Sequence, residues 1–123
     1  MSDFSDRAHA ATKAMRALFE PTPLQRNDHL SARFGADIWL KREDLSPVRS
    51  YKIRGALNAM RKVIGDQDVF VCASAGNHAQ GVAFVCRHFG VQGVIFMPVT
   101  TPQQKVNKTR TFGGDNIEIR LVG

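Results

Sequence analysis

The sequence predicts an α/β domain built on a parallel sheet with alternating helices. Three apolar runs recur about every 24 residues: VFVCA at 69–73, VIFMP at 94–98 and IEIRLV at 117–122. The two intervals have helical patterns, and this alternation indicates parallel strands joined by right-handed crossovers. Because a parallel strand needs cover on both faces, we expect a further helix after Val122 and interpret the chain as a truncated part of a longer fold.

The two crossover helices have recognisable ends. The first is expected over residues 77–89, with Gly90 ending it. For the second, we expect Thr101 as the N-cap and Pro102 at the first helical position. Gln104, three residues after the cap, would complete a capping box. The second helix is expected to end at Gly113 and Gly114.

Shorter elements are expected in the first fifty residues. Apolar residues at spacings of three and four predict a helix over residues 4–19, with Ser5 as its N-cap and Pro21 after its end. An extended piece follows, then a helix from about Asp28 to Gly35 and a strand at 37–42.

Composition narrows the class of protein. The 123 residues are 43% hydrophobic, which is typical of one globular domain. No apolar run reaches the roughly 18 residues of a membrane span, and the N-terminus lacks an apolar signal core, so we expect a cytoplasmic protein with no membrane partner. The net charge of +6 suits anionic partners, among them phosphorylated cofactors, carboxylate substrates and nucleic acid. Cys72 and Cys86 lack metal-ligand spacing, so we expect buried free thiols and no metal site.

A lysine stands where a helix should begin. Ser50 is the predicted N-cap, which places Tyr51 and Lys52 in the first turn of a helix that runs to about Gly65. The positive end of the helix dipole disfavours an ammonium group there. An amine used uncharged, as a nucleophile toward a carbonyl cofactor, explains this placement. The alternative is an ordinary solvated lysine on a first turn.

A second candidate segment, SAGNHAQG at 74–81, follows the first strand of the sheet. Ligands in open α/β sheets bind at this end of the strands, and the amides that open the helix at Asn77 suit a carboxylate or a phosphate. The spacing of Gly76 and Gly81 matches part of a P-loop. The required lysine is missing, which excludes triphosphate binding of that kind. The alternative is an ordinary strand-to-helix turn.

Together, KREDLSPVRSYKIRGA at 41–56 and ASAGNHAQG at 73–81 closely resemble the signature segments of the fold type II pyridoxal phosphate enzymes. Within that group they look most similar to the threonine dehydratases. The resemblance implies a tryptophan synthase β-like fold and pyridoxal 5′-phosphate as cofactor. It assigns residues 1–52 to the N-terminal piece of a large catalytic domain. Residues 53–123 become a small parallel-sheet domain, incomplete at its C-terminus.

The resemblance also implies a role for each matching residue. Lys52 would hold the cofactor covalently and act as general base on the substrate. Tyr51 and Asn77 would contact the cofactor. The substrate carboxylate would be held by the loop residues Ser74, Ala75, Gly76, Asn77 and His78. The implied reaction is the β-elimination and deamination of the amino acid L-threonine to 2-oxobutanoate and ammonia, which begins isoleucine biosynthesis. The enzyme would be a homo-oligomer.

The resemblance places other parts of such a site further along a longer chain, including the glycine-rich loop that binds the cofactor phosphate. A dianionic phosphate without that nest of amides loses much of its binding. We therefore expect the isolated chain neither to bind pyridoxal phosphate tightly nor to turn over threonine.

Three other hypotheses stay open. A serine dehydratase or serine racemase would share both segments. A non-catalytic fragment that binds an anion at 74–81 would leave Lys52 unused. Nucleic-acid binding is the least favoured, because the basic helix face has no interleaved aromatic residue for base stacking. That face consists of Lys105, Lys108 and Arg110.

Several neighbouring residues have structural interpretations. We interpret His78 as a solvated ring at a helix start, since Lys52 already supplies a base. Arg54 is expected to pair locally or with solvent. The residues expected in the core are Phe84, Phe89 and Phe96.

Overall fold

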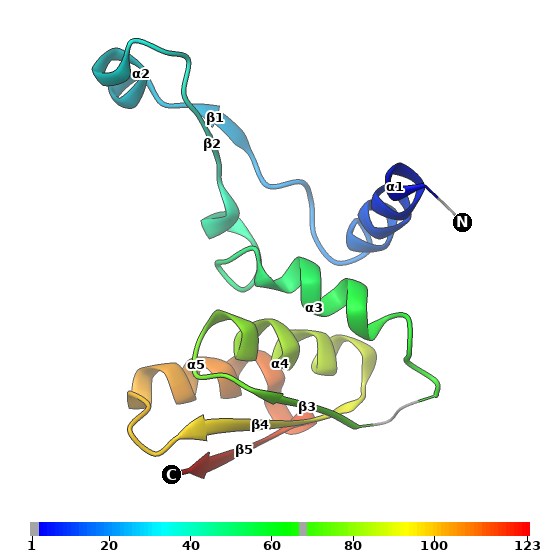
Figure 1. Cartoon of the computed structure of the whole chain (residues 1–123). Coiled ribbons are helices and arrows are strands. Elements are labelled where there is room, and N and C mark those ends of the chain that lie inside the picture. The colour runs from blue at the N-terminus through cyan, green and yellow to red at the C-terminus, as the bar shows by residue number, and fades with distance from the viewer. Residues whose placement is uncertain (1–2, 67–68) are drawn as a thin grey trace.

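The computed structural model describes residues 3–66 and 69–123. Its C-terminal part is a compact α/β unit, and its N-terminal part is an arm that projects away from that unit (Figure 1). Helix α3 (Lys52–Met60) lies at the junction and packs on α4 (Asn77–Phe89). Helices α4 and α5 (Gln103–Gly113) in turn cover one face of the sheet.

The sheet confirms the predicted fold class. Strands β3 (Val69–Ala73), β4 (Gln92–Pro98) and β5 (Ile117–Val122) are parallel and lie in the order β3-β4-β5. Strand β4 begins two residues earlier than the apolar run indicated. Gly90 ends α4 in the left-handed conformation, as expected.

The face of the sheet beneath α4 and α5 forms a closely packed core. Ile95 and Met97 of β4 are fully buried there, against Ala79 and Ala83 of α4 and Val106 of α5. Above α4, a second cluster joins it to α3 and to the end of α1. The core therefore fixes α3 relative to the sheet through α4.

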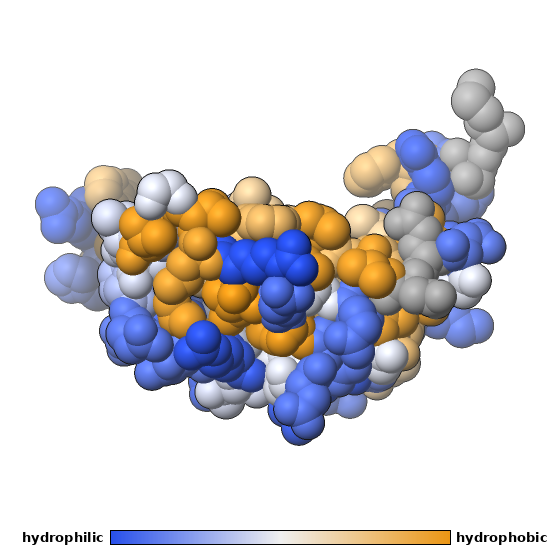
Figure 2. All heavy atoms as spheres, turned by 90° about the horizontal axis from the view of Figure 1, so that it is seen from below, coloured by the Kyte–Doolittle hydropathy of each residue, from blue (hydrophilic) through white to orange (hydrophobic). Residues whose placement is uncertain are grey.

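The opposite face of the sheet is open. Strand residues alternate onto this face, and Val69, Val71 and Val122 are each about half exposed or more. Figure 2 shows the apolar side chains gathered around a charged strip. Glu118 and Arg120 form an ion pair with an N–O distance of 2.7 Å.

One expected core residue lies on that open face. The Arg120 guanidinium lies 5.8 Å from the centroid of the Phe96 ring, and Phe96 is only partly buried. The expectation that Phe96 belongs to the core is therefore wrong, because alternation along β4 turns it away from α4 and α5. Phe84 and Phe89 do pack against the core, although each keeps some exposure.

The N-terminal arm contains α1 (Phe4–Met15), β1 (Leu24–Arg26), α2 (Asp28–Phe34), β2 (Trp39–Lys41) and the 3₁₀ turn η1 (Glu43–Leu45). Strands β1 and β2 pair antiparallel, and α2 connects them. Gly35 ends α2 as predicted, and Asn27 caps its start through a hydrogen bond from the Leu30 amide.

Two predicted caps in other helices are wrong. Helix α1 begins after Asp3, so Ser5 lies inside the first turn and is not the N-cap. The Ser5 side chain contacts His9 instead. The helix also ends at Met15, before a turn that reaches Phe19. Helix α5 begins after Pro102, whose ψ of 133° is extended and not helical, so Thr101 lies outside the cap position.

Within the described residues, no helix is long and apolar enough to cross a bilayer. The same residues contain no cluster of three histidine, cysteine or acidic side chains suited to a metal ion.

Candidate functional site

Lys52 is the first residue of α3, which confirms that it lies in the first turn. Ser50 is not its N-cap. The cap position is Tyr51, and the buried Ser50 hydroxyl has no hydrogen-bond partner in the described part of the chain. The Ser50 main chain is instead held by the Ser46 side chain. The Ser46 hydroxyl donates to the Ser50 carbonyl at 2.8 Å and accepts from the Ser50 amide at 3.0 Å.

The two candidate segments meet where α3 crosses α4. Gly81, the last residue of the loop segment, lies against the Lys52 main chain, and a methyl group there would be 3.3 Å from the Lys52 carbonyl oxygen. A side chain at this position would be closer to the Lys52 backbone than most Cβ contacts are, so glycine favours this approach. Helix packing therefore fixes the Lys52 main chain against α4, the helix that the loop leads into.

The Lys52 side chain lies at a cavity of about 420 Å³ between α3 and the edge of the sheet. Its Nζ atom is 5.2 Å from the centroid of the Tyr51 ring, a cation–π distance. Across residues 3–66 and 69–123, no hydrogen bond or ion pair engages this amine. The cavity is also lined by His78 from α4 and by Phe70 and Cys72 from β3. Lys52, Tyr51 and His78 are thus brought together.

The loop after β3 is held by two hydrogen bonds of Ser74. The Ser74 amide donates to the Phe96 carbonyl at 3.0 Å, and the Ser74 hydroxyl accepts from the Gly76 amide at 3.2 Å. Helix α4 then begins at Asn77 with no side-chain cap, so the amides of its first turn are free for an anion. Asn77 and His78 are exposed.

The structure does not bring all the predicted loop residues to one cavity. Ser74 and Ala75 line a separate hollow of about 360 Å³, together with Phe96, Pro98 and Val122 at the carboxyl end of the sheet. The loop thus stands between two hollows, with His78 toward Lys52 and Ser74 toward the open sheet face.

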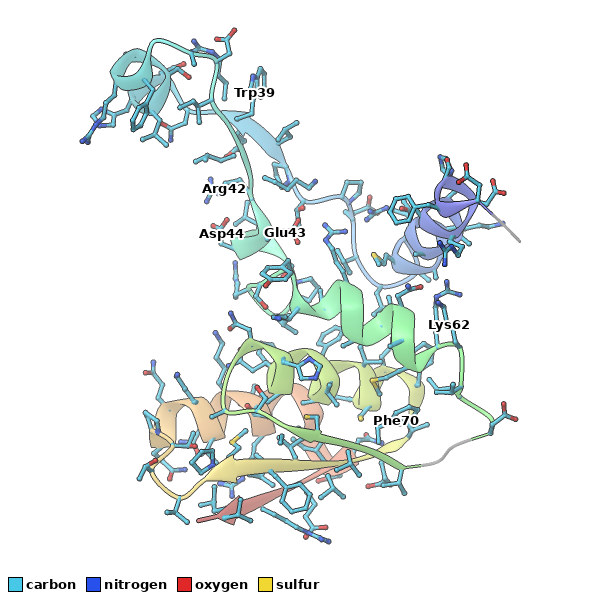
Figure 3. All side chains as sticks on the ribbon, viewed as in Figure 1. Trp39, Arg42, Glu43, Asp44, Lys62 and Phe70 are labelled. Carbon is cyan, nitrogen blue, oxygen red and sulfur yellow. The ribbon has the colours of Figure 1, made fainter. Side chains whose placement is uncertain are left out.

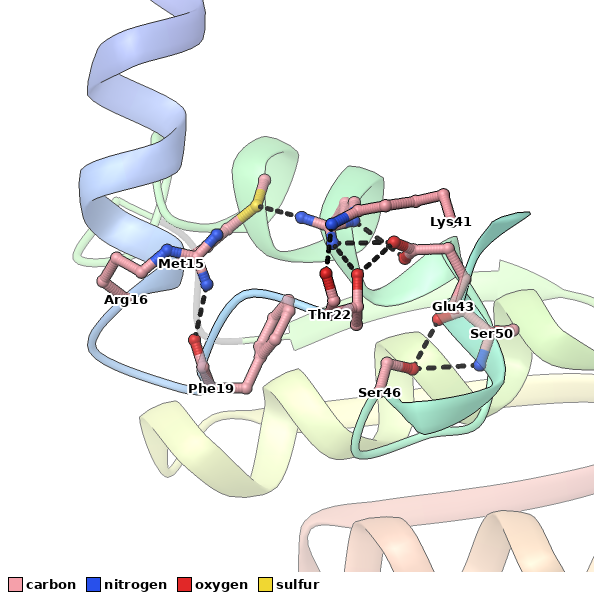
Figure 4. Close-up of polar contacts among 9 residues, drawn as sticks. Met15, Arg16, Phe19, Thr22, Lys41, Glu43, Ser46 and Ser50 are labelled. Atoms are coloured by element: carbon pink, nitrogen blue, oxygen red, sulfur yellow. Dashed lines mark hydrogen bonds and ion pairs between the residues drawn. The ribbon is translucent and has the colours of Figure 1, made fainter. Parts of the chain in front are cut away.

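The ion pair of Arg54, two residues after Lys52, with Glu43 was not predicted from the sequence. Arg54 makes two bonds to the Glu43 carboxylate, from Nε at 2.9 Å and from Nη2 at 2.8 Å. Thr22 donates to the same carboxylate at 2.6 Å. The expectation that Arg54 pairs locally or with solvent is therefore wrong, because its partner is 11 positions away in η1 (Figure 4). The sequence KRED at 41–44 places the Glu43 carboxylate before Lys52, but nothing in it indicates that Arg54 is the partner of Glu43.

The cysteines are both free, as predicted. Burial raises the pKa of the Cys86 thiol to about 11, with a smaller contribution from Cys72. The pKa of Cys72 is also raised by burial. Both side chains are therefore neutral at physiological pH and act as small apolar groups.

The family profile described as "Pyridoxal-phosphate dependent enzyme" matches residues 15–123. The chain belongs to this family. Its helices, parallel sheet and segment order agree with that assignment, and the resemblance of the two signature segments is confirmed.

Curated relatives agree on a narrower group. The chain is 58% identical over 104 residues to the biosynthetic L-threonine dehydratase IlvA of Bacillus subtilis, covering 83% of the chain and 25% of that protein. It is 50% identical over 115 residues to the Mycobacterium leprae protein of the same name, covering 92% of the chain and 27% of the relative. The chain thus spans about a quarter of the length of these relatives.

Solved structures show the same fold. Threonine deaminase isoform 2 of Solanum lycopersicum, in its processed form, matches with a TM-score of 0.80 at 35% identity, covering 99% of the chain and 34% of that structure. Maize serine racemase matches with a TM-score of 0.84 at 27% identity, covering 96% and 36%.

The residues present fit part of a pyridoxal phosphate site. Lys52 offers an amine without a hydrogen-bond partner among the described residues, at a cavity with largely apolar walls. The uncapped start of α4 offers amides to an anion on the adjacent loop. An amine and an anion-binding helix start are two of the groups that such a cofactor and its amino-acid substrate require.

Proposed function

We propose that this chain carries the cofactor lysine and the substrate loop of a threonine dehydratase. The observation that carries the proposal is the cavity lined by both Lys52 and His78, because it brings the lysine side chain and the end of the loop segment to one space. The names of the curated relatives given above support threonine as the substrate.

Each residue has a defined task in this proposal. Lys52 binds the cofactor covalently and, when released, takes the proton from the substrate Cα. Tyr51 and Asn77 flank the cofactor. Residues 74–78 hold the substrate carboxylate so that the Cα–H bond faces Lys52. The Ser74 hydroxyl and the amides of Ala75, Asn77 and His78 take part directly, and the Gly76 amide, which bonds the Ser74 hydroxyl in the chain alone, turns to the carboxylate when substrate binds. Pyridoxal phosphate, when bound, supplies the electron sink for the carbanion.

The overall conversion is L-threonine to 2-oxobutanoate and ammonia, with the water lost in elimination returned in hydrolysis. As parts of the same proposal, residues 1–52 belong to a large catalytic domain and residues 53–123 to a small domain. The complete enzyme is a cytoplasmic homo-oligomer of isoleucine biosynthesis, with no membrane or nucleic-acid partner.

The direct test is to mix the purified chain with pyridoxal phosphate, reduce with borohydride and map the modified lysines by peptide mass spectrometry. We expect Lys52 to be modified several-fold faster than Lys62, an exposed lysine beyond the end of the same helix (Figure 3). Equal modification of the two would contradict the proposed role. We expect no threonine turnover by the chain alone, and sustained ammonia release would contradict that expectation.

A serine-specific relative is the second candidate, favoured by the match to maize serine racemase. The residues described do not distinguish a serine side chain from a threonine side chain. Assays of a full-length protein that contains this segment, with both amino acids, separate the two by the ratio of kcat/KM values.

A further inference from the structure

We propose that the ion pair between Glu43 and Arg54 is a positioning device for Lys52. Neither residue contacts the Lys52 amine. They act on the main chain that carries it, because Arg54 lies two residues after Lys52 and in the same turn of α3. The proposal rests on the proposed role of Lys52 as the cofactor lysine.

The pair joins three segments of the chain. Glu43 comes from η1, Arg54 from α3, and Thr22 from the connection between α1 and β1. Arg54 Nη2 lies 3.1 Å from the Thr22 hydroxyl, which itself donates to Glu43, so the three side chains close a ring of hydrogen bonds. A bidentate guanidinium–carboxylate pair fixes orientation as well as distance. The start of α3 is thereby tied to the arm.

Further contacts hold Arg54 from its other side. The guanidinium carbon lies 5.3 Å from the centroid of the Phe19 ring, and Nη1 lies 3.7 Å from the Met15 sulfur (Figure 4). The Arg54 amide donates to the Tyr51 carbonyl at 3.0 Å and so belongs to the first hydrogen-bonded turn. A displaced Arg54 would therefore displace the turn that begins at Lys52.

The Lys52 main chain is thus braced from two directions. The Glu43–Arg54 pair acts from the arm, and Gly81 acts from α4. A single contact would leave the helix start free to rotate about it, whereas two contacts on different sides define the direction of the lysine side chain. Small displacements matter, since a shift of about 1 Å in a reacting group can cost about 100-fold in rate.

The neighbouring pair of Arg42 and Asp44 provides a matched comparison. It is also bidentate, with bonds of 2.9 and 2.7 Å, but it joins residues two positions apart and makes no hydrogen bond or ion pair with α3. The Asp44 side chain is 57% exposed, against 19% for Glu43. In Figure 3, Glu43 points to one side of the chain, and Arg42 and Asp44 point to the other.

The test compares Glu43→Gln with Asp44→Asn in the 123-residue chain. Each variant removes one carboxylate charge at nearly constant volume. Pyridoxal phosphate with borohydride is the probe, and the readout is the ratio of modification at Lys52 to that at Lys62 in the same sample. We expect the ratio to fall about tenfold in Glu43→Gln. In Asp44→Asn the ratio of Lys52 to Lys62 modification should stay within about twofold of its value in the unsubstituted chain. In Glu43→Asp the ratio should be partly restored.

A second readout, amide hydrogen exchange of residues 50–54, does not depend on the cofactor. We expect faster exchange of this segment in Glu43→Gln, while α4 and the sheet keep their protection. An equal ratio and equal exchange in Glu43→Gln and Asp44→Asn would overturn the positioning role. A ratio of one between Lys52 and Lys62 modification in the unsubstituted chain would instead overturn the proposed function. Hydrogen exchange alone would then decide whether the Glu43–Arg54 pair orders the start of α3.

Discussion

Gly81 on α4 lies against the main chain of Lys52 on α3, so that a methyl group at Gly81 would lie 3.3 Å from both the carbonyl carbon and the carbonyl oxygen of Lys52. This distance is shorter than most contacts of a Cβ atom. Backbone atoms cannot move aside as a flexible side chain can, so the spacing of the two helices depends on this glycine.

We expect Gly81→Val to separate α3 from α4. The added isopropyl group overpacks the crossing and should lower the free energy of unfolding by about 1–3 kcal/mol. Urea unfolding followed by circular dichroism measures the change. Gly55→Ala on α3 is the control, because a Cβ there meets nothing within 4 Å, and the better helix propensity should stabilise by about 0.5–1 kcal/mol. A fully stable Gly81→Val variant would show that the crossing tolerates a larger spacing.

Gly93 and Cys86 should be energetically coupled. A Cβ at Gly93 would lie 2.7 Å from the Cys86 sulfur, closer than real Cβ atoms approach. Gly93→Ala should therefore destabilise, and Cys86→Ala should relieve part of that cost by removing the sulfur. In a double-mutant cycle we expect a coupling of about 0.5–3 kcal/mol in favour of the double variant. Strict additivity of the two changes would contradict the contact.

Stability should fall in acid partly through Glu43. Hydrogen bonds from Arg54 and then from Thr22 favour the ionised carboxylate, so the pKa of Glu43 is lowered from its ordinary 4.5. A lowered folded pKa gives stability that is complete above the unfolded value and is lost as the pH falls through the folded value. We expect Glu43→Gln to be less stable than the unsubstituted chain at pH 7, with the difference shrinking below about pH 4. Urea unfolding of both proteins at several pH values measures it, and a difference independent of pH would contradict this assignment.

The thiols should differ from an exposed cysteine in their reaction with iodoacetamide. Since burial raises the pKa of Cys86 to about 11, little thiolate forms at pH 8. We expect slow alkylation of Cys86 in the folded chain and rapid alkylation in urea. Cys72, which lines the Lys52 cavity, should react faster than Cys86 in the folded chain. Mass spectrometry after timed quenching measures both sites, and equal folded-state rates would contradict the burial of Cys86.

The parallel sheet could be predicted from sequence because strand and helix periods are local properties. The three strands and α4 lie at or near the residues that their apolar patterns indicate. Helix starts were less predictable, since a cap depends on backbone angles and not only on residue type. Ser50 illustrates this. The Ser46 hydroxyl is hydrogen-bonded to the main chain of Ser50. Arg49, the residue before Ser50, has a positive φ of 62°.

The candidate site was predictable in part for the same reason. Lys52 and the loop at 74–78 could be found from two segments, 41–56 and 73–81, each continuous along the chain. The ion pair of Glu43 with Arg54 depends on how η1 folds back onto α3, and the closure of the ring by Thr22 depends on a segment 32 positions from Arg54. Such tertiary contacts have no local pattern.

The order β3-β4-β5 also has a kinetic consequence. Each strand pairs with the strand that follows it along the chain, so each ladder closes a shorter loop than pairing with a more distant strand would, at a lower entropic cost. The contacts of Arg54 with Thr22 and Met15 span 32 and 39 positions. The unit of α4, α5 and the sheet should therefore form early, and the N-terminal arm should dock onto α3 afterwards. The orientation of Lys52 would then be among the last features of the folded chain to be set.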